Sequence, residues 1–80
     1  MNQELFDNIY PAMNNAIYPI ALSSNNTRDD QETFLFCLAY ILGQCFFLSQ
    51  HSVPNQIDIR MIGSAIESGA NSAKDKFEPS

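Results

Sequence analysis

The sequence predicts an all-α fold, a compact domain of three helices over residues 1–80, and three observations support it. The first is an apolar run over residues 34–48, FLFCLAYILGQCFFL, in which only Gly43 and Gln44 are not apolar. The second is the helical spacing of apolar residues in the segments on either side of this run. The third is chain length, since a chain this short forms one domain and buries only about 60 to 65% of its unfolded surface.

The first helix is predicted over residues 3–21. Its apolar side chains form one stripe at helical spacing, made of Leu5, Ile9, Ala12, Met13, Ala16, Ile17 and Ile20. Pro11 removes a backbone donor and clashes with the preceding turn, at a cost of about 3 kcal/mol. We expect the helix to bend at Pro11, and the competing interpretation is two short helices with a break at Tyr10. Pro19 predicts that the helix ends close by.

The second helix is predicted over residues 28–50, because Thr27 is a good N-cap and acidic residues follow it. Its apolar side chains form two faces. One face contains Phe34, Leu38, Ile41, Cys45 and Leu48. The other, which we call the aromatic face, contains Phe36, Tyr40, Gly43 and Phe47. Glycine in a helix interior costs about 1 kcal/mol relative to alanine, so we expect another backbone to approach Gly43 closely.

The third helix is predicted over residues 54–75, because proline is tolerated in a first turn and Pro54 follows a break. A stripe of small and aliphatic residues runs along it, made of Ile59, Ile62, Ile66, Ala70, Ala73 and Phe77. We expect this smooth stripe to pack closely against the aromatic-rich second helix. The alternation over residues 57–61 leaves a strand as the competing interpretation. Residues 76–80 are expected to fray.

The composition argues against several classes of function. The net charge is −5 and the four basic residues are scattered, so no stripe exists to bind nucleic acid. Cys37 and Cys45 lie about 12 Å apart on one helix, too far for a disulfide. His51 is the only histidine, which leaves no ligand cluster for a metal.

Catalysis is also not predicted. Cys45 and His51 are the only candidates for a nucleophile and its base. Cysteine among Phe, Leu and Ile acts as an inert small hydrophobe, and histidine after a helix commonly serves as a cap. We therefore expect a protein that is not an enzyme and has no catalytic residue, cofactor or metal ion.

A membrane span is not predicted from the apolar run. Fifteen helical residues reach about 22 Å, whereas a hydrocarbon core needs about 30 Å. Acidic residues precede the run, and Gln50 and His51 follow it. No basic cluster marks an interface, and the acidic residues at the start of the sequence do not resemble a secretory signal. The expected location is the cytoplasm, in agreement with reduced thiols.

Protein binding is the predicted function, because a helix that is apolar all round must be covered on every side. Two flanking helices leave an arc uncovered, so we expect a homodimer or larger oligomer that also binds another protein stoichiometrically, as a regulator, adaptor or inhibitor. Phe36, Tyr40 and Phe47 are expected to carry association, while Gly43 permits close approach. Tyr10 and Tyr18 are expected either as outlying contacts or as cover for the core edge.

Three alternatives stay open from the sequence. The flanking helices could hide both faces of the central helix within one chain. A small molecule or nucleotide could be held between subunits by a binding or sequestering protein. The aromatic face could instead lie against lipid in a membrane-associated accessory protein.

Overall fold

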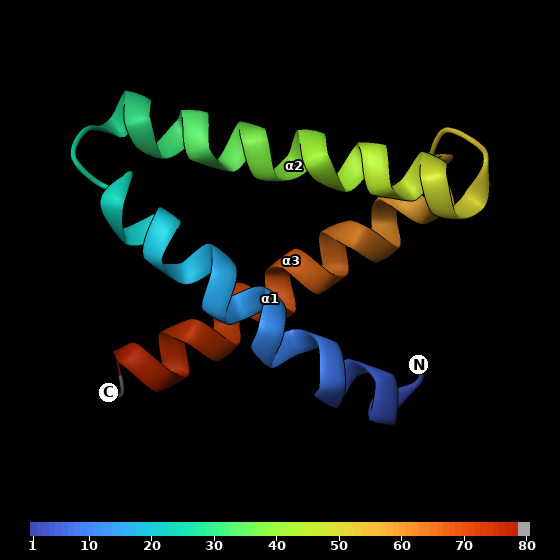
Figure 1. Cartoon of the computed structure of the whole chain (residues 1–80), viewed down its shortest axis with the longest axis horizontal. Coiled ribbons are helices and arrows are strands. Elements are labelled where there is room, and N and C mark those ends of the chain that lie inside the picture. The colour runs from blue at the N-terminus through green and yellow to red at the C-terminus, as the bar shows by residue number, and fades with distance from the viewer. Residues whose placement is uncertain (79–80) are drawn as a thin grey trace. The chain divides into compact units, whose positions relative to one another are not determined.

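The computed structural model describes residues 1–78, and it confirms the all-α class. Three helices follow one another along the chain (Figure 1). They are α1 (Gln3–Ser23), α2 (Arg28–Gln50) and α3 (Gln56–Phe77). No strand occurs among the described residues, and the segment 57–61, for which a strand was the alternative, lies within α3.

Helix α1 is continuous through both of its prolines. Asn2 caps its start, where the side-chain oxygen accepts a hydrogen bond from the Leu5 amide at 3.0 Å. The alternative of two short helices with a break at Tyr10 is therefore wrong, whereas a bend at Pro11 stays a prediction. The helix also runs past Pro19, because one missing amide leaves the hydrogen bonds on either side intact.

Helix α2 has the predicted bounds and the predicted cap. The Thr27 hydroxyl accepts a hydrogen bond from the Asp30 amide at 3.1 Å. At the other end, His51 has a φ of 56°, in the left-handed region, and its amide donates to the Phe47 carbonyl at 2.7 Å. This bond satisfies a carbonyl of the last turn, so His51 ends the helix through its backbone.

Helix α3 begins at Gln56 and not at the predicted Pro54. Asn55 and Asp58 form a reciprocal capping box, in which each side chain accepts from the amide of the other, at 2.9 and 3.0 Å. Since this pair satisfies two free amides at once, it fixes the first helical residue two positions after the proline. The helix extends to Phe77, beyond the predicted end at residue 75, and residues 79–80 of the expected tail lie outside the described part.

The chain divides into two units, Met1–Ile41 and Leu42–Ser80, whose boundary falls within α2. Neither unit has a hydrophobic core, because no side chain among residues 1–78 is buried. Partly covered residues occur only near the interhelix loops. In the first unit they are Ile17, Ala21, Ser24 and Phe34. In the second unit they are Phe46, Pro54, Asp58 and Ile62. The single chain therefore does not show the expected compact packing.

The predicted packing of the α3 stripe is also not seen. Ile59, Ile66 and Phe77 stay exposed, and only Ile62 of the large residues in the stripe is partly covered. Helical spacing placed these residues on one side of α3, but it does not specify a neighbour. The stripe remains an apolar surface without a described contact.

Candidate functional site

The aromatic face of α2 is exposed along its whole length. Phe36 is 68% exposed, Tyr40 60% and Phe47 52%. The rings of Phe36 and Tyr40, one helical turn apart, lie 6.1 Å from centroid to centroid and are tilted by 35°. The structure thus brings two of the predicted residues into contact with each other, while nothing in the described chain covers the face.

Gly43 is a notch in this face that the chain itself does not use. A Cβ atom built on Gly43 would have no neighbouring atom within 4 Å. Glycine weakens the helix interior by about 1 kcal/mol relative to alanine. No contact of such a Cβ in the described chain compensates for this cost, and the expected close approach to Gly43 stays a prediction.

The opposite face of α2 is slightly better covered at its start. Phe34 is only partly exposed, as are Ile17 and Ala21 near the end of α1 in the same unit. Farther along α2, Ile41 and Leu48 are exposed. The cover at the loop between α1 and α2 is therefore local, and it does not replace a core.

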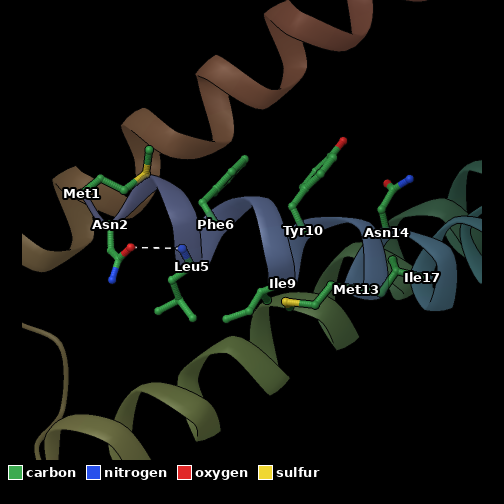
Figure 2. Close-up of a pocket in the computed structure, with 9 residues that line it drawn as sticks. All are labelled: Met1, Asn2, Leu5, Phe6, Ile9, Tyr10, Met13, Asn14 and Ile17. Carbon is green, nitrogen blue, oxygen red and sulfur yellow. Dashed lines mark hydrogen bonds between the residues drawn. The ribbon is translucent and has the colours of Figure 1, made fainter.

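Tyr10 lies on α1 beside an aromatic residue that the sequence pattern did not single out. The rings of Phe6 and Tyr10 stack at 5.3 Å with an interplanar angle of 9°. Figure 2 shows both rings on one side of α1, with Leu5, Ile9 and Met13 projecting to the other. The four-residue spacing of Phe6 and Tyr10 was the available signal, since such pairs meet on a helix. Tyr18 is exposed farther along α1.

An open groove follows the same stretch of α1. Its lining is mostly apolar and comes entirely from the first seventeen residues, with Asn2 and Asn14 as its polar members (Figure 2). Small-molecule sites enclose about 70 to 90% of the ligand surface. A groove lined by a single helix cannot provide such enclosure, so its form favours contact with another protein surface.

The charges are unevenly divided between the two units. Residues 1–41 carry five acidic and one basic residue, whereas residues 42–80 carry four acidic and three basic residues. The net charges are therefore −4 and −1. The ion pair of Arg28 with Glu32, at 3.1 Å, is exposed and contributes less than about 1 kcal/mol. A net charge of −4 disfavours binding of phosphate groups to the first unit.

The remaining residues considered for catalysis or metal binding are the two cysteines and the histidine. Cys37 and Cys45 are free thiols and are exposed in the single chain, contrary to their expected burial. Within residues 1–78, no three metal-ligating side chains come together. His51 contributes a backbone hydrogen bond at the end of α2, in line with its predicted place as a cap.

Among the described residues, α2 alone is long and apolar enough to cross a membrane by length and composition. The whole helix of 23 residues is about 34 Å long, so the length of the apolar run alone understated its reach. Asp29 and Asp30 in its first turn remain unfavourable in hydrocarbon. Core helices of soluble proteins pass the same test, so it does not choose between protein and lipid as the cover.

No protein-family model, no curated protein and no solved structure matches this chain. The function must therefore be inferred from the exposed apolar surface, the notch at Gly43 and the distribution of charge.

Proposed function

We propose that this chain is a non-catalytic protein-binding module that assembles as a homodimer or larger oligomer through the aromatic face of α2. The single observation that carries the proposal is that Phe36, Tyr40 and Phe47 are all more than half exposed in a chain without a buried side chain among residues 1–78. Large aromatic residues dominate the energetics of protein interfaces. Such a face is therefore well suited to association.

The energetics of the helices support the same proposal. Ordering one residue costs about 1 to 2 kcal/mol of conformational free energy, and isolated helices in water are marginal. The apolar side chains of this chain offset that cost only when they leave water. Since the chain alone covers none of the described residues fully, assembly is the proposed source of its stability and of the compact form expected from the sequence.

The biological role we propose is stoichiometric regulation, as a regulator, adaptor or inhibitor in the cytoplasm. Tyr10 and Tyr18 act as outlying contacts, Tyr10 together with the stacked Phe6. The acidic surface supports a protein partner over nucleic acid, because phosphate groups repel a net charge of −5.

The proposal is tested by placing a charge on the aromatic face. Phe36→Asp and Tyr40→Asp should convert the oligomer into monomers or unfolded chain, because a buried unpaired carboxylate strongly disfavours the interface. Ser49→Asp is the matched control, since it adds the same charge to α2 on the side away from this face. Sedimentation velocity gives the oligomeric state and circular dichroism gives the helix content.

Three results would contradict the proposal. The first is a native chain that sediments as a monomer at every concentration, which would mean that the helices close on themselves. The second is flotation of the native chain with phosphatidylcholine vesicles, which would mean that lipid covers α2. The third is an unchanged oligomer in both aspartate variants, which would remove the aromatic face as the interface.

A further inference from the structure

We propose that a second copy of this chain covers the aromatic face, with the two α2 helices antiparallel and Tyr40 of each seated over Gly43 of the partner subunit. This inference rests on the proposed function, because it names the occupant and the register of the same face. The spacing of the face, the sizes of its side chains and the charges of α2 all support this arrangement.

The spacing of the face is that of two helices paired along a seam. Its members are separated by four, three and four residues, which is the alternation of positions a and d in a heptad. One further step in each direction reaches Thr33 and Gln50, both still within α2. The six positions are symmetric about the midpoint between Tyr40 and Gly43. An antiparallel two-fold axis at this midpoint pairs Thr33 with Gln50 and brings two polar side chains together at each end.

Side-chain size selects the antiparallel arrangement. The antiparallel two-fold axis places the Tyr40 ring over the notch at Gly43 of the partner subunit. This ring is 60% exposed in the single chain. A Cβ at Gly43 meets nothing within 4 Å, so the notch is free to receive a ring. A parallel pair would place tyrosine against tyrosine and glycine against glycine. One layer would then be overfilled and the next would be empty, which close-packed interiors do not tolerate.

The charges of α2 select the same arrangement. All of its ionised groups lie near its start, and they are Arg28, Asp29, Asp30 and Glu32, with a net charge of −2. A parallel pair would hold two such clusters side by side. An antiparallel pair separates them by about 30 Å, well beyond the Debye length of about 8 Å in physiological salt. It also sets the two helix dipoles in opposite directions.

The symmetry of the face favours a second copy over a short peptide. A second copy brings the same seam, in which Tyr40 and Gly43 face each other twice about the two-fold axis. The face is complementary to itself, as an isologous interface requires.

Disulfide trapping of the full chain tests the register. Cys37→Ser and Cys45→Ser give a cysteine-free parent, into which Thr33→Cys and Gln50→Cys are introduced separately. The antiparallel seam brings these two positions of different subunits within the roughly 7 Å that a disulfide spans, whereas a parallel seam holds them about 25 Å apart. The two variants, one carrying a size tag, are unfolded together, refolded and oxidised with glutathione disulfide.

The expected result is a covalent dimer of the two variants on a non-reducing gel, with none from either variant alone. Sedimentation of the cysteine-free parent beside the native chain controls for altered packing. If serine alters assembly, Cys37→Ala and Cys45→Ala replace it.

Each other outcome overturns the inference in a recognisable way. Covalent dimers from each variant alone would mean a parallel pair, which leaves the proposed function standing. An oligomer without any crosslink would mean that another surface or register is used. A native chain that stays monomeric, or that floats with lipid vesicles, would remove the proposed function together with the inference.

Discussion

Replacing Gly43 by alanine separates the two environments that α2 can have. In the chain alone the added methyl group meets no atom within 4 Å, so the substitution is sterically free. Alanine would then stabilise the helix by about 1 kcal/mol through its higher helix propensity. In the antiparallel pair, the same methyl group enters the layer filled by Tyr40 of the partner subunit. Overpacking of this kind costs about 1 to 3 kcal/mol.

The chain offers matched controls at its other two glycines. Gly63 and Gly69 lie inside α3, and a Cβ at either position also has no neighbour within 4 Å. Both lie outside the proposed seam of α2, so Gly69→Ala and Gly63→Ala should each stabilise the protein by about 1 kcal/mol. For a domain of this size, that gain raises the melting temperature by about 4 to 8 °C. Gly43→Ala should fall below them by about 1 to 3 kcal/mol.

Thermal unfolding at several protein concentrations, followed by circular dichroism, provides the measurement. Sedimentation of the same samples shows whether Gly43→Ala lowers the fraction of oligomer at a concentration where Gly69→Ala does not. If Gly43→Ala stabilises the protein as much as Gly69→Ala at every concentration, no second molecule approaches α2 at this position. That result would refute the proposed seam.

Three further substitutions probe the helix ends and the proline in α1. Asn55→Ala removes the capping box and should lower the unfolding free energy by about 1 kcal/mol in a urea titration; an unchanged midpoint would deny the cap a role in stability. His51→Gly relieves a positive φ and should raise the melting temperature, by a gain of up to about 1 kcal/mol, whereas a decrease would show that the imidazole makes a stabilising contact. Pro11→Ala restores a helical amide and should increase both ellipticity at 222 nm and stability, by up to about 3 kcal/mol; a loss of oligomer would instead show that assembly needs the proline.

The positions of the helices were largely readable from local signals. Thr27 was recognisable as a cap, and it accepts the expected hydrogen bond from the first turn of α2. Pro54 does not begin α3, because the pair of Asn55 and Asp58, whose spacing of three residues is a capping signal, places the start at Gln56. Pro19 does not end α1, since one missing donor does not stop a helix.

The neighbours of each face were not readable in the same way. Helical spacing correctly assigns residues to one side of a helix, but it carries no information on which surface covers that side. Ile59 and Ile66 illustrate this limit, because their stripe was expected to lie against the second helix and both remain exposed. Phe6 illustrates the converse, since its stacking with Tyr10 was local and followed from spacing alone.

No side chain among residues 1–78 is buried, so in the proposed assembly the folded state depends on the concentration of the protein itself. If folding and assembly share one equilibrium, refolding becomes a second-order reaction and the midpoint of unfolding rises with total protein. Dilution alone would then return the helices to coil, without any ligand or modification. A cell that stops making this protein would lose the assembled form through dilution, before proteolysis removes the last copy.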